Sequence, residues 1–146
     1  MTRVQVKKLN DRAILPTSGS RFAAGYDLYA CLDRGSIDIL PHKTVVIPTG
    51  LSFALPEGTF GAVFARSGIA SKEGLRPANC VGVCDSDYRG EYAVALHNDS
   101  DVPRVVRHGD RIAQLVLLSF LPMEFSEVDA LDETGRGAGG FGSTGK

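Results

Sequence analysis

The sequence predicts a single all-β domain, built as a sandwich, jelly roll or barrel of short strands. Its 146 residues fit one domain, and the 43% that are hydrophobic can fill a sizeable core. The apolar residues occur in short runs, mostly with a period of two, and turn-forming residues separate these runs at regular spacing. Many short strands with such punctuation are typical of all-β folds.

The expected strands follow one another along most of the chain. Their apolar residues alternate with polar ones or are β-branched, which favours a half-buried pleated surface. The runs are Val4 with Val6, Leu28–Leu32, Ile37 with Ile39, Thr44–Ile47, Leu51–Leu55, Thr59–Phe64, Tyr92–Leu96 and Ile112–Leu118. Helix signal is weak, and the best candidate is a short stretch near Ile69–Glu73.

Charge and hydropathy argue against several classes of partner. The formal net charge is −1, so nothing in the balance suggests nucleic acid or an anionic membrane as the partner. No stretch reaches the length of about 18 apolar residues that a membrane span needs, and the first residues have no apolar run of signal length. We therefore expect no nucleic acid, no membrane, and a cytoplasmic location, or nucleus and cytoplasm in a eukaryote.

The cysteines and histidines predict neither a disulfide framework nor a protein-built metal site. Three cysteines are an odd number, and they are scattered along the chain. Cys80 and Cys84 are four apart, but no third or fourth ligand follows at zinc spacing, and the histidines are dispersed. Free thiols in a reducing compartment are the expected state of Cys31, Cys80 and Cys84.

Composition changes at the end of the chain. We divide the sequence into a β domain, residues 1–134, and a flexible glycine-rich arm, residues 135–146. Six of the twelve arm residues are glycine, so the segment cannot bury enough surface to order itself. Gly140–Lys146 resembles most of a phosphate-binding P-loop, but no Ser or Thr follows the lysine and no strand and helix flank it, so we reject that interpretation.

Four further segments concentrate polar residues in turns between the expected strands. Each has an ordinary explanation when taken alone, such as a bulge, a simple turn, a hairpin loop or a Gly-Asp turn. The segments are Ala23–Leu28, Ala65–Ala70, Asn79–Gly90 and Gly109–Gln114.

Taken together with the arm, these segments resemble the five motifs of the trimeric deoxyuridine triphosphatases, in the family's order. The resemblance spans residues 23–145, and the third and fifth segments are the most specific. It implies a jelly-roll-like β-barrel or sandwich, a homotrimer with shared active sites, and hydrolysis of dUTP to dUMP and pyrophosphate with Mg²⁺. That reaction would keep uracil out of DNA and supply dUMP for dTMP synthesis.

The resemblance also assigns roles to residues. Asp85 would activate the water that attacks the α-phosphorus. Arg66, Ser67, Gly68 and Gln114 would contact phosphates, joined from the arm by Arg136, Gly142, Ser143 and Thr144. Asn79 and the backbone of Gly82, Val83 and Cys84 would read uracil, Tyr88 would exclude a 2′-hydroxyl, and Phe141 would stack on the base. Phosphates and waters would hold the Mg²⁺, which no side chain binds directly. Asp27 would reach the metal only through water, or would support the site structurally.

Two positions depart from the family's pattern. Ala65 stands where proline is usual, just before Arg66, and Cys84 stands where an aliphatic residue, often isoleucine, is usual. Neither side chain is expected to carry chemistry, since Cys84 can fill an apolar slot and the loss of proline only loosens the approach to Arg66.

Two rival functions stay open at the level of sequence. A deoxycytidine triphosphate deaminase shares the fold, but it should need a glutamate at the pyrimidine C4 position, whereas the third segment has the aspartate-and-tyrosine pattern of the hydrolase. A non-catalytic trimer that binds a nucleotide or a protein partner would need no base such as Asp85.

Overall fold

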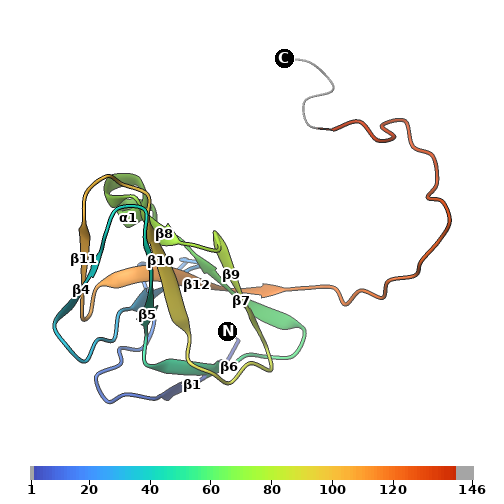
Figure 1. The fold of residues 1–146 in the computed structure, drawn as a ribbon. Coiled ribbons are helices and arrows are strands. Elements are labelled where there is room, and N and C mark those ends of the chain that lie inside the picture. The colour runs from blue at the N-terminus through green and yellow to red at the C-terminus, as the bar shows by residue number, and fades with distance from the viewer. Residues whose placement is uncertain (1, 141–146) are drawn as a thin grey trace.

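The computed structural model describes residues 2–140 and confirms the all-β prediction (Figure 1). Within these residues there are twelve strands and one short helix. The strands are β1 (Gln5–Lys8), β2 (Thr17–Ser18), β3 (Tyr26–Tyr29), β4 (Ser36–Ile39), β5 (Thr44–Pro48), β6 (Leu51–Ala54), β7 (Thr59–Phe64), β8 (Leu75–Pro77), β9 (Val81–Asp85), β10 (Ala93–Asn98), β11 (Arg104–Arg107) and β12 (Arg111–Ser119), and the helix is α1 (Ser67–Glu73).

The strands form one five-stranded sheet, one three-stranded sheet and two strand pairs, and every pairing is antiparallel. The larger sheet has the order β2-β3-β12-β7-β9, and the smaller has the order β5-β10-β8. β1 pairs with β6, and β11 pairs with β4. The consecutive strands β9 and β10 therefore belong to different sheets, and they diverge from each other.

The core lies between these sheets and is built by the predicted alternation. On β10 the side chains alternate between buried and less buried positions, as a period of two requires. The side chains of Leu28, Ile39, Ile47, Leu96 and Ile112 are almost fully buried and come from five different strands. Burial of each contributes about 1.5–3 kcal/mol, which ties the strands together despite their short length.

Helix α1 interrupts the strands between β7 and β8. It begins after Arg66, whose backbone is extended, and it ends at Gly74. Gly74 has a φ of 70°, a conformation that glycine adopts without steric cost, and its N–H bonds back to the carbonyls of Ala70 and Ile69. The helix places Ser67 and Gly68 in its first turn.

The sequence pattern placed Asn79–Gly90 among the turns between strands and predicted no strand there, whereas residues 81–85 form strand β9. The run Val81-Gly-Val-Cys-Asp85 is short and contains a glycine, so its strand signal is weak; pairing with β7 along its whole length decides the outcome. The strands β2, β8 and β11 were also missed, and each has four residues or fewer.

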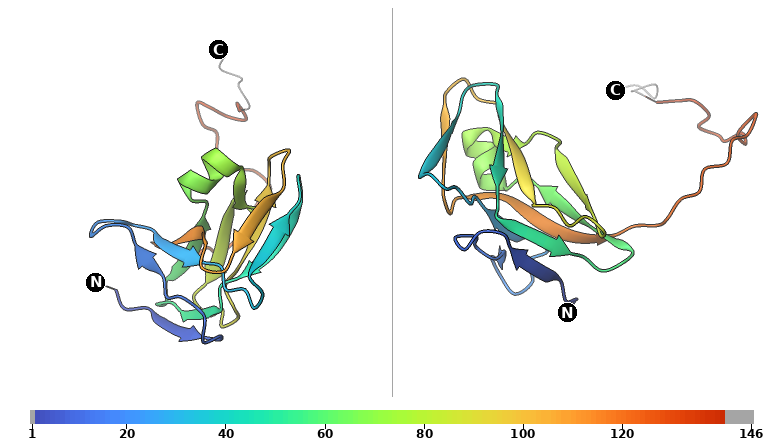
Figure 2. Two further views of the ribbon diagram at one scale, coloured as in Figure 1. Left: turned by 90° about the vertical axis from the view of Figure 1, so that its left-hand side faces the viewer. Right: turned by 60° about the horizontal axis from the view of Figure 1, so that its bottom comes forward.

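Residues 120–140 contain no helix or strand and leave the body of the domain after β12 (Figures 1 and 2). Their side chains are largely exposed. Four predicted site residues lie outside the described part of the chain: Phe141, Gly142, Ser143 and Thr144. Between residues 2 and 140, no helix has both the length and the hydropathy to cross a bilayer.

Candidate active site

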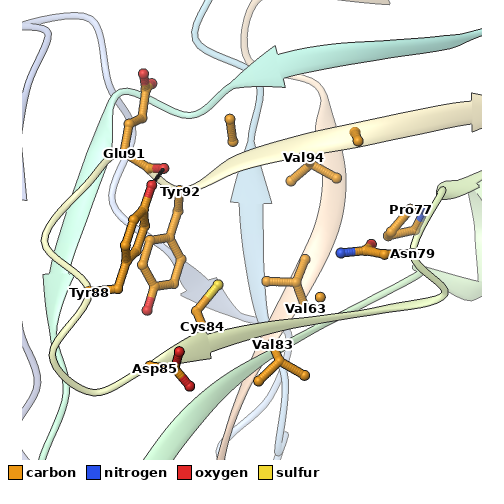
Figure 3. A pocket seen from close by; sticks show the side chains of 13 residues that line it. Val63, Pro77, Asn79, Val83, Cys84, Asp85, Tyr88, Glu91, Tyr92 and Val94 are labelled. Atoms are coloured by element: carbon orange, nitrogen blue, oxygen red, sulfur yellow. Dashed lines mark hydrogen bonds between the residues drawn. The ribbon is translucent and has the colours of Figure 1, made fainter.

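A pocket of about 300 Å³ opens between the diverging strands β9 and β10 (Figure 3). We call it the β9–β10 pocket. β8 pairs only with the far end of β10, from Leu96 to Asn98, and the N–H of Ala78 donates to the carbonyl of Ala95, so residues 93 and 94 stay open toward β9. The volume is at the lower end of the range for small-molecule sites. Its walls include six predicted site residues: Asn79, Gly82, Val83, Cys84, Asp85 and Tyr88.

Asp85 ends strand β9 at the mouth of this pocket, and its side chain is exposed. Its backbone carbonyl accepts a hydrogen bond of 3.2 Å from the N–H of Tyr88, which closes a tight turn. Its carboxylate has no hydrogen bond and no ion pair to any residue in the described range. A carboxylate that is not neutralised by the protein is available to a water molecule or a ligand in the pocket.

Tyr88 folds back over the same turn. Its hydroxyl donates a hydrogen bond of 3.1 Å to the carbonyl of Glu91, and its ring remains half exposed on the pocket side. The ring can lie there because residue 90 is glycine. A Cβ atom at Gly90 would stand 2.8 Å from Cε2 of Tyr88 and closer still to its hydroxyl.

Strand β9 is an edge strand, so part of its backbone is free to bind a ligand. Only β7 pairs with it, and alternate N–H and C=O groups of an edge strand point away from the sheet. Asn79 lies at the far end of the pocket, where its amide nitrogen would be 3.2 Å from a Cβ atom at Gly82. Free backbone donors and acceptors beside one side-chain amide can recognise the edge of a planar base.

A second group of predicted residues gathers around Asp27, and we call it the Asp27 cluster. The carboxylate of Asp27 is 15% exposed and accepts a 2.6 Å bond from Nε of Arg66 and a 3.3 Å bond from Nη1 of Arg111. Gln114 pairs with Asp27 across β12 and β3, and its amide donates to the carbonyl of Ala65 at 2.8 Å. Asp27 thus holds the side chain of Arg66, and Gln114 holds the backbone of the residue before it.

The β9–β10 pocket and the Asp27 cluster lie far apart within one chain. Asp27 on β3 is in register with Gln114 on β12, then Phe64 on β7 and Val81 on β9. Asp85 is four residues further along β9. With ordinary sheet dimensions, the two carboxylates are on the order of 19 Å apart. Arg136 contacts neither group, because its Nε donates to the carbonyl of Gly139 at 2.8 Å.

Comparison with known proteins identifies the family. A family model described as dUTPase matches residues 11–145. The chain belongs to the dUTPase family. The deoxyuridine 5′-triphosphate nucleotidohydrolase of Desulfitobacterium hafniense is 58% identical over 132 residues, which cover 90% of this chain and 87% of that protein. The protein of the same name from Arabidopsis thaliana is 47% identical over 141 residues, covering 97% and 82% respectively.

Solved dUTPase structures have the same fold. The dUTPase of Staphylococcus bacteriophage 80alpha with dUPNHPP is similar with a TM-score of 0.90 and 27% identity, and each chain is covered completely. Its G164S mutant with dUpNHpp is similar with a TM-score of 0.89 and 26% identity, again over both whole chains. The predictions of a dUTPase-family enzyme and of a jelly-roll-like β fold are therefore confirmed.

Three residues around the candidate dUTPase site were missed by sequence reasoning. Arg111 lies inside the fourth motif segment, and its Nη1 donates to Oδ2 of Asp27. This contact could not be inferred without the register of β12 and β3. Glu91 and Tyr92 follow the third segment directly and line the pocket. Tyr92 belongs to an apolar run that indicates a core strand, so nothing in the sequence marked it for a site.

The described residues suit an Mg²⁺ ion that is bound mainly by the substrate. Across residues 2–140 there is no group of three or more histidine, cysteine or acidic side chains placed to hold a metal. Asp27 uses one lone pair of each carboxylate oxygen for an arginine, so further lone pairs remain for a metal-bound water. Mg²⁺ commonly keeps several waters and uses substrate phosphates, which agrees with this sparse set of ligands.

Proposed function

We propose that the protein hydrolyses dUTP to dUMP and pyrophosphate, with Asp85 as the general base. The observation that carries the proposal is the carboxylate of Asp85 at the mouth of the β9–β10 pocket, where no residue between 2 and 140 pairs with it. Its family membership supports dUTP as the substrate, because relatives at 44–58% identity are named deoxyuridine 5′-triphosphate nucleotidohydrolases. By this activity the enzyme keeps uracil out of DNA and supplies dUMP for dTMP synthesis, in the cytoplasm or also in the nucleus of a eukaryote.

In the proposed complex, uracil enters the gap between β9 and β10. The free backbone groups of residues 82–84 pair with its edge, and the amide of Asn79 adds a side-chain contact. A wrong base would leave these groups desolvated and unpaired, which gives strong discrimination. The ring of Tyr88 lies against the deoxyribose and leaves no space for a 2′-hydroxyl.

The chemical step is the attack of a water molecule on the α-phosphorus. The water oxygen forms a bond to the phosphorus as its proton passes to the carboxylate of Asp85. The bond from the α-phosphorus to the bridging oxygen breaks, and pyrophosphate leaves with that electron pair. No residue between 2 and 140 occupies the carboxylate oxygens of Asp85, so they are available to accept that proton.

The phosphates are bound by the Asp27 cluster and the adjoining turn. Arg66, Ser67 and Gly68 contact them directly, and Gln114 supports them through its amide. Charge-assisted bonds from arginine to phosphate are about twice as strong as neutral ones. Asp27 keeps the guanidinium of Arg66 in place when no substrate is bound. Bound Mg²⁺ supplies charge neutralisation of the triphosphate and of the departing pyrophosphate.

These assignments require more than one copy of the chain. Arg66 and Asp85 act on the same α-phosphate and must both lie within a few ångströms of it. Within one chain they belong to groups on the order of 19 Å apart, given ordinary strand spacings. We therefore infer an oligomer in which the Asp27 cluster of one subunit faces the β9–β10 pocket of another, and the resemblance to the trimeric deoxyuridine triphosphatases implies that this oligomer is a homotrimer.

The arm completes the site in this proposal. Residues 135–146 close over the bound nucleotide, and Phe141 stacks on uracil. Arg136, Ser143 and Thr144 contact the terminal phosphates, and Gly142 joins Phe141 to Ser143. The β domain of residues 1–134 provides the remaining contacts. Residues 120–140 leave the domain as an exposed chain, which is compatible with reaching a neighbouring subunit (Figure 2).

The one glutamate that lines the pocket does not favour the rival deaminase. Oε1 of Glu91 accepts a 2.6 Å hydrogen bond from the N–H of Gly50, so this carboxylate is used to join two loops. A deaminase would release ammonia from dCTP, whereas the proposed hydrolase releases pyrophosphate from dUTP.

The test is product release from dUTP, dCTP, dTTP and UTP, with and without Mg²⁺, by the wild type and by Asp85→Asn. We expect pyrophosphate from dUTP alone, dependent on Mg²⁺, and at least about a hundredfold lower kcat in the variant with dUTP binding retained. Ammonia from dCTP, or a variant with turnover within about tenfold of the wild type, would contradict the proposal.

A further inference from the structure

Tyr92 lies under the pocket and is not part of any recognised motif. It stands just before β10, it is 2% exposed, and it lines the β9–β10 pocket together with Tyr88. Its N–H donates to the carbonyl of Leu51 at 2.8 Å, and its carbonyl accepts from the hydroxyl of Thr49. The backbone at Tyr92 is therefore anchored to the β6 side of the domain, and its ring is held as firmly as a core residue.

The ring of Tyr92 packs between the core and Tyr88. Its centroid is 4.5 Å from that of Phe53 on one side and 5.9 Å from that of Tyr88 on the other. Aromatic pairs at these separations attract each other. Tyr88 is itself 46% exposed, and its other side-chain anchor in the described range is the single hydrogen bond to the carbonyl of Glu91. The buried ring of Tyr92 thus supports the half-exposed ring of Tyr88 from the core side.

The buried hydroxyl of Tyr92 allows the role of the ring to be tested separately from the role of the oxygen. Within the described residues this buried hydroxyl has no hydrogen-bond partner of good geometry. It lies beside the thiol of Cys84, and a Cβ atom at Gly61 would come within 3.4 Å of it. Burying an unpaired hydroxyl costs free energy, so phenylalanine would supply the same ring without that cost.

We propose that Tyr92 is a positioning residue that sets the depth of the Tyr88 ring and thereby the preference for a 2′-deoxy sugar. The inference rests on the proposed function, in which Tyr88 lies against the deoxyribose. Without the ring of Tyr92 beneath it, Tyr88 sinks toward Phe53 and opens the space that a 2′-hydroxyl needs. The sugar selectivity of the pocket therefore depends on a buried residue that acts through the position of the Tyr88 ring.

The experiment measures kcat and KM for dUTP and UTP, with Mg²⁺ and the full-length protein. We expect Tyr92→Leu to lower the ratio of kcat/KM for dUTP over UTP by at least about tenfold, equivalent to about 1.4 kcal/mol. Tyr92→Phe keeps the ring and should keep the ratio within about twofold, about 0.4 kcal/mol on the same scale. Ile39→Ala is the matched control, since it removes a fully buried side chain of β4 and should lower Tm without changing the ratio.

The same assay separates this inference from the proposed function. If Tyr88→Ala changes the ratio and a folded Tyr92→Leu does not, the role of Tyr92 is wrong and the role of Tyr88 stands. If Tyr88→Ala leaves the ratio unchanged, the sugar-facing role of Tyr88 fails first, and the inference fails with it. Should Tyr92→Leu not fold, Tyr92→Met takes its place with the same expected loss, and an unchanged ratio in it overturns the inference.

Discussion

The substitution Gly90→Ala should change the position of Tyr88 without altering the tyrosine itself or the carboxylate of Asp85. A Cβ atom at residue 90 would lie 2.8 Å from Cε2 of Tyr88 and closer to its hydroxyl, so the two cannot coexist as placed. The φ of Gly90 is outside the left-handed region, which means that the backbone itself accepts alanine. The obstacle is the ring alone, and a half-exposed ring can swing away from the turn.

The cost in stability should be small. Swinging the ring outward breaks its hydrogen bond to the carbonyl of Glu91, worth about 0.5–1.5 kcal/mol. Replacing glycine by alanine restricts the unfolded chain and returns about 0.4–1 kcal/mol. We therefore expect the free energy of unfolding to change by less than about 1 kcal/mol, from the difference of these two effects.

The cost in function should be large. With its ring displaced, Tyr88 no longer lies against the sugar, and the ratio of kcat/KM for dUTP over UTP should fall by at least about tenfold, or about 1.4 kcal/mol. The assay is pyrophosphate release from both nucleotides, with thermal unfolding measured on the same protein. Gly35→Ala is the control, because no atom lies within 4 Å of its added Cβ and its φ is also outside the left-handed region.

Two results would refute this reasoning. An unchanged ratio in a folded Gly90→Ala variant would show that the ring position does not govern sugar selectivity. A stability loss of several kcal/mol would show that the ring is held far more tightly than one hydrogen bond and one aromatic contact suggest. Either conclusion requires that Gly35→Ala has the wild-type ratio and stability, because this control shows that an added methyl group alone has no effect.

Three further predictions follow from the same structure. Asp27→Asn should raise the KM for dUTP by at least about tenfold, because the carboxylate of Asp27 binds Arg66 and a neutral amide would hold it less firmly. Steady-state kinetics measure this effect, with Asp38→Asn, which changes an exposed carboxylate of β4, as the control. An Asp27→Asn variant with the KM of the wild type would disprove the prediction. Cys84→Ile should overpack against Tyr92 and lower the free energy of unfolding by about 1–3 kcal/mol. The loss should be much smaller when Cys84→Ile is combined with Tyr92→Val, and additive losses in denaturant unfolding would argue against direct packing of residues 84 and 92. Deletion of residues 135–146 should leave the thermal unfolding of the β domain unchanged but reduce kcat/KM at least about tenfold, since base stacking alone is worth about 1–3 kcal/mol; a truncated enzyme with normal kinetics would remove the arm from the site.

The packing around Tyr92 gives one departure from the family pattern a physical reason. Cys84 stands where an aliphatic residue is usual, and the hydroxyl of Tyr92 lies beside its thiol. Burial raises the pKa of the Cys84 thiol, and burial, followed by Cys84 itself, raises the pKa of Tyr92. Both groups therefore remain neutral at physiological pH, and the small thiol leaves space for the large ring. Nothing in the structure explains Ala65 beyond the acceptance of a hydrogen bond by its carbonyl from Gln114, which any residue there could provide.

The sequence by itself determined the fold class and most of the central strands. Alternation of apolar residues reports which side of a strand faces the core, and this is a local property that survives without knowledge of the partner strand. Runs such as Thr59–Phe64 and Ile112–Leu118 became strands close to their predicted bounds. The motif segments likewise predict Asp85, Tyr88 and Arg66 as site residues, and the structure places Asp85 and Tyr88 in one pocket and Arg66 beside Asp27.

Only the tertiary structure decided how these residues are distributed. The register of β3, β12, β7 and β9 separates Asp27 from Asp85, and register depends on packing between strands that are distant in the sequence. The same long-range packing turned residues 81–85 into an edge strand and brought Tyr92 under Tyr88. A period of two cannot encode these facts, since it describes one strand at a time and says nothing about which strand lies beside it.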